Sequence, residues 1–261
     1  ATATDKNDGN ITQVVFFGSN GSAPTNSDIL FIRLNVTNGT ALTYNWTAPV
    51  IKNSSDLLLL LHFDNRSIFG ENTTLINDYS NNNYDGHAIA GAFNWTSAVL
   101  GGAYKFGASN TNISFGDQDS LIGFNHTYMF WVNPFATSGT QTIIDKLNSI
   151  AGSGLRIDAS GKNIVVTADA STITATNLLA KNVFTHIAVT IDPNGATSIY
   201  KNSVLATTGS FSTLTANNIG FTLGAIPGGT QTLDNGLLDE LVVVNRTLSG
   251  PEVKNAYRLP R

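Results

Sequence analysis

The sequence predicts an all-β fold: a two-sheet antiparallel sandwich with a short C-terminal helix and an N-terminal extension that contains strands. From about Ser54 onward, short runs of β-branched and aromatic residues recur between Gly, Asn, Asp and Pro. Asn194-Gly195 lies between two of these runs and has the residue types of a tight hairpin turn. A helix is well indicated only near the C-terminus. Strands recurring at such short spacing are typical of a sandwich.

The expected strands are apolar, β-branched or aromatic stretches bounded by turn residues. They are Leu57 to Leu61, Ile113 to Phe115, Thr127 to Val132, Gln141 to Lys146, Gly154 to Ile157, Asn163 to Ala168, Phe184 to Ile191, Ser198 to Lys201, and Leu237 to Val244. The turn at Asn194-Gly195 predicts that the two stretches on either side of it pair as antiparallel neighbours.

The expected helix begins at a capping box. Ser249 and Glu252 have the spacing of such a box, and Pro251 falls in the first turn, where its missing N–H costs nothing. Val253, Ala256 and Tyr257 then lie on one helical face. This helix is expected to close the sandwich.

Two regions are expected along the chain. Residues 1–52 form a β extension or assembly segment with short strands at Ile11 to Phe17 and Ile29 to Leu34 and with Trp46 in a third apolar stretch. Its apolar surface is too small for an independent core, so we expect it to dock on the main domain, pair with a partner chain, or connect to an element outside this sequence. Residues 53–261 form the sandwich domain.

The composition limits the partners. Charged residues make up only 12% of the chain, the formal net charge is -4, and no run of Lys or Arg occurs. Nucleic acid and a polybasic membrane anchor are therefore not expected. The chain has no cysteine, which excludes disulfides, a thiolate nucleophile and a Cys-ligated zinc. No apolar run approaches the roughly 20 residues of a membrane helix, so we expect no membrane span in this chain and interpret it as a mature or trimmed ectodomain.

N-glycosylation motifs are frequent and unevenly distributed. In residues 1–125, eleven of 18 asparagines begin the motif N-x-[ST], against one of 12 afterwards. This asymmetry predicts a glycosylated extracellular or cell-surface protein, although an Asn/Thr-rich turn composition without glycans is the alternative. The acceptor asparagines are Asn10, Asn20, Asn35, Asn38, Asn45, Asn53, Asn65, Asn72, Asn94, Asn112, Asn125 and Asn245.

A series of motifs links this chain to a known family. They are LLLHFD from Leu59, INDYSNNNYDGHA from Ile76, GGAYKFG from Gly101, MFWVNP from Met129, FTHIAVTID from Phe184, SIYKNS from Ser198 and GLLDELVVVNRTLSGPEV from Gly236. In this order the chain resembles the laminin-G-like jelly-roll family of concanavalin A-like lectin and glucanase domains. The resemblance implies a jelly-roll sandwich, and the fold hosts lectins, adhesion modules, accessory domains and glycosidases. The segment from Gly9 to Asn35 also resembles, more weakly, the strand region of archaeal pilins and archaellins.

The resemblance implies one cofactor, a structural Ca²⁺. Relatives commonly hold this ion on the outer face between the first and last strands, and the corresponding positions are Asp64 and Asp239, with Asp78 as a possible third ligand. The alternative is that Asp239 pairs with a nearby Lys or Arg and that Asp78 forms an Asx-turn.

No catalytic residue is expected. The alternating carboxylates of laminarinase-like glycosidases, E-x-D-x-E, do not occur, and the three glutamates, at positions 71, 240 and 252, form no convincing pair. The histidines, at positions 62, 87, 126 and 186, lack metal-ligand spacing and are expected to be structural. Trp131 is a candidate core residue.

Three hypotheses on function remain open. The first is a non-catalytic adhesion or recognition module that binds a glycan or a surface protein. The second is a structural subunit that assembles with copies of itself in a glycosylated filament or surface layer. The third is a glycoside hydrolase or its accessory domain. Because eleven of the twelve motifs precede residue 126, we expect the later part of the chain to supply the contact surface.

Overall fold

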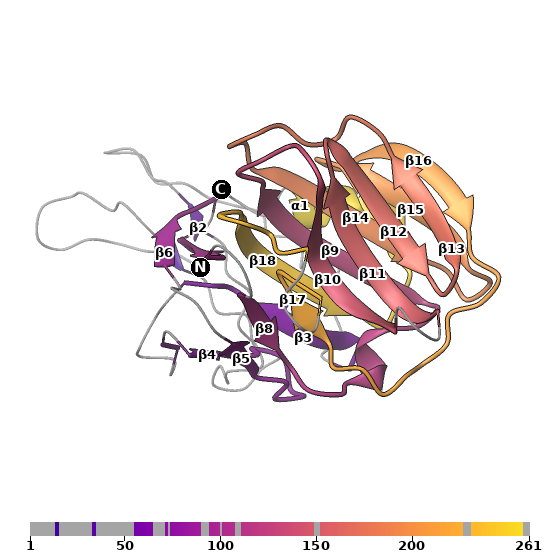
Figure 1. Ribbon diagram of the computed structural model, residues 1–261, viewed down its shortest axis with the longest axis horizontal. Helices are drawn as coiled ribbons and strands as arrows, with labels where there is room; N and C mark the ends of the chain where they lie inside the picture. Colours follow the sequence, from indigo (N-terminus) through magenta and orange to yellow (C-terminus); the bar gives the residue numbers. More distant parts are fainter. Residues whose placement is uncertain are drawn as a thin grey trace, which may run out of the picture.

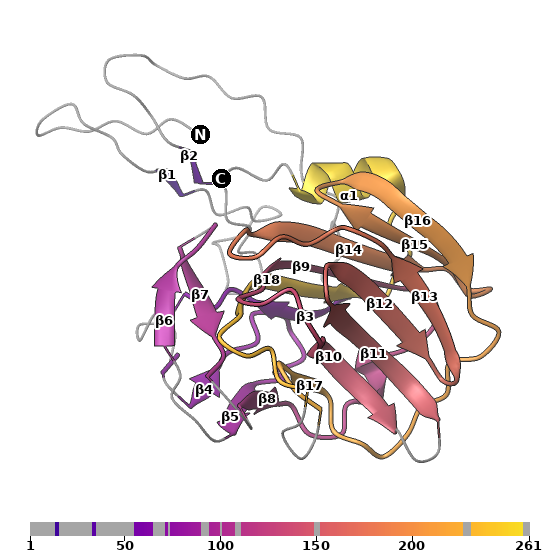
Figure 2. The same ribbon diagram turned by 45° about the horizontal axis from the view of Figure 1, so that its top comes forward.

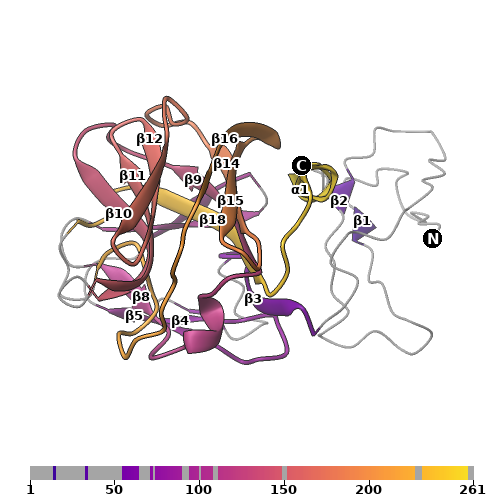
Figure 3. The same cartoon turned by 90° about the vertical axis from the view of Figure 1, so that its right-hand side faces the viewer.

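The protein folds as a sandwich of two antiparallel sheets, which confirms the predicted fold class (Figures 1 and 3). The computed structural model describes residues 14–15, 33–34, 55–64, 71–72, 74–89, 94–99, 101–107, 111–148, 152–226 and 231–257. None of the helices in these residues is long and apolar enough to span a bilayer.

The first sheet has eight strands in the order β13-β12-β11-β10-β17-β8-β5-β4. Their bounds are β4 Leu75–Ile76, β5 Gly86–Ile89, β8 Asn112–Ser114, β10 Thr140–Asn148, β11 Ser153–Ser160, β12 Asn163–Ala168, β13 Ser171–Ala175 and β17 Thr222–Leu223.

The second sheet has the order β16-β15-β14-β9-β18-β7-β6, and β3 pairs with β18 beside β7. Their bounds are β3 Leu57–Leu61, β6 Asn94–Ser97, β7 Gly102–Lys105, β9 His126–Asn133, β14 Thr185–Ile191, β15 Ala196–Lys201, β16 Val204–Ser210 and β18 Leu237–Val244. The predicted hairpin is confirmed, because β14 pairs antiparallel with β15 from Ile187↔Lys201 to Ile191↔Thr197.

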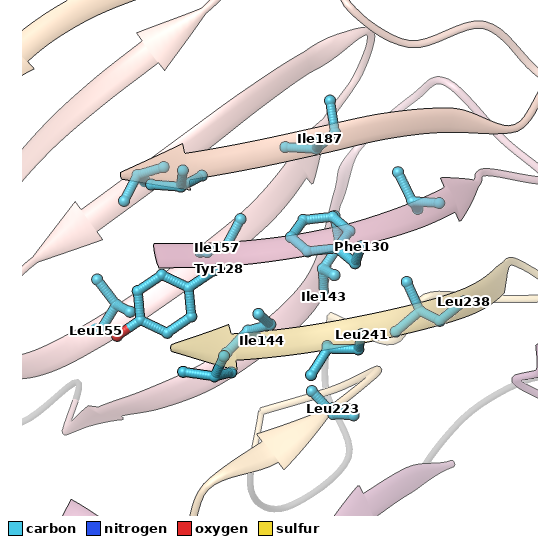
Figure 4. Packing of buried hydrophobic residues seen from close by; sticks show 14 of the residues in the cluster. Tyr128, Phe130, Ile143, Ile144, Leu155, Ile157, Ile187, Leu223, Leu238 and Leu241 are labelled. Atoms are coloured by element: carbon cyan, nitrogen blue, oxygen red, sulfur yellow. The ribbon is translucent and has the colours of Figure 1, made fainter. Parts of the chain in front are cut away.

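The core lies between the sheets and follows from alternation along the strands. In β9, Tyr128 and Phe130 are fully buried and point toward the first sheet, where Ile144, Leu155 and Ile157 meet them (Figure 4). Alternate side chains of a strand point to opposite faces, so each strand of the first sheet leaves a second set of side chains on its outer face.

The C-terminal helix α1, Gly250–Tyr257, lies outside the second sheet (Figure 3). The Ser249 N–H and Oγ both donate to Glu252 Oε2, at 2.8 and 2.7 Å, so the predicted capping interaction forms. Trp131 is buried, but outside the inter-sheet core: its ring stacks on Tyr257 of α1 at 5.5 Å between centroids. The helix therefore covers that outer face.

Several short strands were not predicted. β16 and β13 contain many Ala, Ser and Thr and have largely exposed side chains, so they lack the apolar alternation that marks a strand in sequence. They form because each pairs with a neighbour, β15 and β12. Of the expected N-terminal extension, the structure describes only the pair β1 (Val14–Val15) and β2 (Arg33–Leu34). The rest of the predicted segment 1–52, including Trp46, lies outside the described residues.

Candidate functional site

The first candidate region is the junction of β3, β7 and β18. Here two of the predicted calcium ligands, Asp64 and Asp239, accept hydrogen bonds from the same turn. Asp64 follows β3 and its Oδ1 accepts the Gly102 N–H at 2.8 Å. Asp239 of β18 is fully buried and its Oδ2 accepts the Val99 N–H at 3.2 Å. Both carboxylates therefore bind the turn that leads into β7.

A β-bulge shapes this junction. The pairing of β18 with β9 shifts register between Asp239 and Val242, and Glu240 has a left-handed φ of 49°. The Glu240 carboxylate contacts His62 Nδ1, with Oε2 at 2.9 Å. Burial lowers the pKa of His62, but the carboxylate charge of Glu240 and its hydrogen bond outweigh burial, so the pKa is raised above its ordinary value. His62 is thus an ion-pair partner of the last strand.

Asp78, the third predicted ligand, lies elsewhere. Its Oδ1 accepts the N–H groups of Leu60 and Ser80, at 3.0 and 2.8 Å, and its Oδ2 accepts from Ser80 Oγ and the Tyr84 N–H, at 2.6 and 3.0 Å. The contact to Ser80, two residues on, is an Asx-turn. Among the described residues, no three His, Asp or Glu side chains gather as a metal-binding group. A cation here would need Asp64, Asp239 and backbone carbonyls as ligands.

The second candidate region is the outer face of the first sheet. One side chain from each of seven neighbouring strands stands in a single register row, which we call the polar row: Thr172, Thr167, Arg156, Asp145, Thr222, Ser114 and His87. Their strand neighbours, such as Leu155, Ile157 and Ile113, are in the core, so the row faces away from it.

An ionic cluster occupies the middle of the polar row. Arg156 Nε donates to Asp145 Oδ1 at 2.5 Å, and Thr142 Oγ1 donates to Asp158 Oδ1 at 2.8 Å. Asp145 is fully buried and Asp158 is 7% exposed. Burial raises the pKa of Asp145, against the opposing effect of Arg156. Burial also raises the pKa of Asp158, to about 6. Asp145 is thus paired with the guanidinium, while Asp158 accepts from a hydroxyl and is influenced by the charge of Arg156.

This cluster was not predicted from the sequence, although a signal was present. In β11, Arg156 and Asp158 alternate with the core residues Leu155, Ile157 and Ala159. Charged residues at alternate positions are unusual in a chain with only 12% charged residues. That alternation could have indicated a polar outer face.

The glycosylation motifs within the described residues differ in exposure. Asn72 and Asn245 are exposed, Asn125 is half-buried and Asn112 is 7% exposed. Asn125 Oδ1 accepts the Thr247 N–H at 3.1 Å. Asn94 lies in β6. The predicted acceptors at positions 10, 20, 35, 38, 45, 53 and 65 lie outside the described residues.

Two of the remaining histidines, His126 and His186, have structural surroundings. The ring nitrogens of His126 contact the carbonyl oxygens of Phe124 and Ser120, at 2.9 and 3.0 Å. His186 lies beside Trp131 on the outer face under α1, with ring centroids 5.3 Å apart. His87 is exposed in the polar row.

Comparison with solved structures shows the same fold in larger binding domains. The binding domain of botulinum neurotoxin serotype D matches with a TM-score of 0.61 and 15% identity over 78% of this chain and 52% of that chain. The binding domain of Paraclostridial Mosquitocidal Protein 1 matches with a TM-score of 0.61 and 16% identity, also over 78% and 52%. The receptor-binding domain of botulinum neurotoxin type G matches with a TM-score of 0.58 and 20% identity over 78% and 51%. The chain thus spans about half the length of these domains.

A search of curated protein sequences gave no match. A family model described as the concanavalin A-like lectin/glucanases superfamily, Laminin_G_3, matches residues 106–254, which is more than half of the chain. This range contains the buried strands β9, β10, β11, β14 and β18 that build the sandwich. The chain belongs to the concanavalin A-like lectin/glucanase superfamily.

Proposed function

We propose that this protein is a non-catalytic recognition module of an extracellular surface glycoprotein, and that it binds a carbohydrate on the outer face of the first sheet. The observation that carries the proposal is the polar row, which crosses seven strands without an apolar side chain. Asp145, Arg156 and Thr222 are buried in the middle of the row, so the groups open to a ligand are the hydroxyls of Thr172, Thr167 and Ser114 and the imidazole of His87. Such groups suit a ligand that is rich in hydroxyl groups.

Two further points support binding rather than hydrolysis. Asp145 and Asp158, the paired carboxylates of this face, are both buried, and Arg156 lies beside them. A glycosidase needs carboxylates that reach the scissile bond. A botulinum neurotoxin serotype D ligand-binding domain, which has a similar fold, has been solved in complex with N-acetylneuraminic acid. A sialylated glycan is therefore a reasonable first probe.

The test uses two variants at the half-buried flanks of the row, Ser114→Leu and Thr167→Leu, which leave the ionic cluster intact. Binding of the chain to an array of neutral and sialylated glycans should be lost in both. Thr208→Leu on β16 is the matched control, because Thr208 is an exposed strand residue of the other sheet. Unchanged melting temperatures would show that the variants fold. Wild-type protein that binds no glycan, or variants that bind as wild type, would contradict the proposal.

A further inference from the structure

The two ends of the sandwich differ in charge on the β14–β15–β16 side. We call the end at which β9 stops and β14 starts the basic end. Here residues 133–140, 160–163, 175–185 and 201–205 carry Lys162, Lys181 and Lys201 and no carboxylate. Their strands end at the same edge, as the contacts Leu179 N–H to Lys162 O (2.9 Å) and Asn182 N–H to Pro134 O (2.9 Å) show. The turn before β18, which starts opposite the end of β9, adds the half-buried Asp234 to this end.

Exposed apolar side chains gather at this same basic end. Of the five large apolar residues that are exposed in the described residues, Phe135, Val183, Val204 and Leu205 lie here, with exposed fractions of 48%, 51%, 69% and 52%. They follow β9, precede β14 and begin β16, and Lys181 Nζ lies 4.9 Å from the centre of the Phe135 ring. Figure 2 shows β14, β15 and β16 side by side in this sheet. Exposed apolar residues that share one end of the sandwich with lysines suit a contact with another molecule.

The opposite end is acidic. Its described turns contain Asp117, Asp119, Asp169 and Asp192. The cations described at this end are Lys146 and Arg246, and Arg246 is already paired with Asp56 and Glu252, at 3.7 and 2.7 Å. We call this the acidic end. Lys146 is fully buried, with its Nζ 2.5 Å from Asp117 Oδ1 and 3.0 Å from Asp119 Oδ1, while the two aspartate side chains are 49% and 56% exposed.

Hydrogen bonds hold the carboxylates of the acidic end in place. Asp169 Oδ1 accepts the N–H groups of Gly154 and Thr215, at 2.8 and 3.0 Å. Partial burial raises the pKa of Asp169, but these backbone donors outweigh it and keep the pKa below its ordinary value. Asp192 Oδ1 likewise accepts the N–H groups of Asn194 and Ala196. The acidic end is thus ordered before any partner arrives.

The two ends are electrostatically separate. The nine residues of β10 run between them, which corresponds to about 30 Å of extended strand. The Debye length at physiological ionic strength is only about 8 Å, so the charges of one end have little effect at the other end. A molecule with a net charge of -4 therefore presents a local basic edge that complements its own acidic edge.

We propose that copies of this protein associate head to tail, with the basic end of one copy docked on the acidic end of the next. The three lysines would face the four aspartates, and the four exposed apolar residues would supply the part of the interface that excludes water. The half-buried Leu214 and Ile219 at the acidic end offer apolar surface to receive them. Such a contact joins two different surfaces, so it does not close on itself in a dimer and permits linear assembly. This contact involves neither the polar row nor its ligand.

The test uses the full 261-residue chain, made without N-glycans. Sedimentation velocity measures its mass in solution over a range of concentrations. Wild-type protein should exceed the 27.7 kDa of one chain as its concentration rises. Raising the salt from about 0.1 M to about 1 M should weaken association, since the Debye length falls from about 10 Å to about 3 Å.

Two double variants each change the charge of only one end. Lys181→Glu with Lys201→Glu alters only the basic end, and Asp169→Asn with Asp192→Asn lowers the charge of the acidic end while keeping an oxygen to accept the turn hydrogen bonds. Each pair should weaken self-association by about tenfold or more, because several charge contacts are lost at once. Mixed together, the two variants should form a 1:1 complex, since each retains the end that the other lacks. Melting temperatures control for folding.

The proposal fails if wild-type protein remains monomeric at all concentrations, or if the mixed variants do not pair. It also fails if the charge variants associate as wild type, which would indicate a symmetric contact elsewhere. Cosedimentation with vesicles of phosphatidylserine and phosphatidylcholine tests the alternative that the basic end binds an anionic lipid surface. Monomeric protein that binds these vesicles through Lys181 and Lys201 would overturn the head-to-tail contact in favour of an anionic lipid surface.

Discussion

At the scale of single residues, the buried carboxylate Asp158 links stability to pH. Burial raises its pKa from 3.8 to about 6, against the opposing effects of its hydrogen bond to Thr142 and of Arg156. The folded protein therefore holds this proton more tightly than the unfolded chain. The stability that the proton contributes is present below pH 3.8 and is lost as the pH rises through about 6.

Asp158→Asn should remove this dependence, because the amide is neutral and its oxygen can still accept from Thr142 Oγ1. Above pH 6, we expect the variant to equal or exceed the wild type in free energy of unfolding, by up to about 3 kcal/mol for a pKa difference of about two. Urea unfolding at several pH values measures this difference. Asp192→Asn, in an exposed turn, is the control and should leave the pH dependence in place. A variant that is less stable than wild type at neutral pH would contradict the account of Asp158.

At the scale of secondary-structure elements, turn and capping motifs correctly predicted the features that depend on contacts between residues close in sequence. The hairpin turn at Asn194-Gly195 and the capping pair Ser249 and Glu252 both formed as expected, because their residues are close in sequence. The polar row could not be predicted in this way, since its members come from seven strands and meet only through the register of the sheet. The bulge at Glu240 also depends on the neighbouring strand, β9.

The junction of β3, β7 and β18 allows a test of the proposed calcium site. If Asp64 and Asp239 hold Ca²⁺, a hundredfold excess of the ion over its dissociation constant should stabilise the fold by about 2.7 kcal/mol. Asp64→Asn should abolish the response of the melting temperature to Ca²⁺, whereas Asp78→Asn should preserve it, because Asp78 is occupied by its own turn. A melting temperature that is the same in Ca²⁺ and in chelator would exclude the site.

At the scale of the whole molecule, the two ends of the proposed contact differ in their relation to the glycosylation motifs. The acidic end includes Asp117 and Asp119 and lies beside the acceptor Asn125, which accepts the Thr247 N–H. The basic end, with Phe135, Lys181, Val183 and Val204, is built from residues after 125, where the motifs nearly cease. A glycan keeps a partner at a distance, so a surface without acceptor motifs is available for contact. The expectation that the later part of the chain supplies the contact surface is therefore a prediction for the basic end alone, and glycan positions test it directly.

Glycopeptide mapping of protein from its native source should find Asn72 modified, because its side chain is exposed. Asn112 should be unmodified although it has the same motif, because its side chain is 7% exposed and a glycan attached there could not fit in the folded sandwich. Of the acceptors outside the described residues, Asn20, Asn38 and Asn53 should also be modified.

A new motif at the basic end, made by Val204→Thr after Asn202-Ser203, should be glycosylated and should block self-association. Its matched control without an acceptor carries Val204→Thr together with Asn202→Gln and should associate as wild type. Unmodified peptides throughout residues 1–125 would remove the glycoprotein proposal, and a glycan at position 202 without effect on association would show that the contact lies elsewhere.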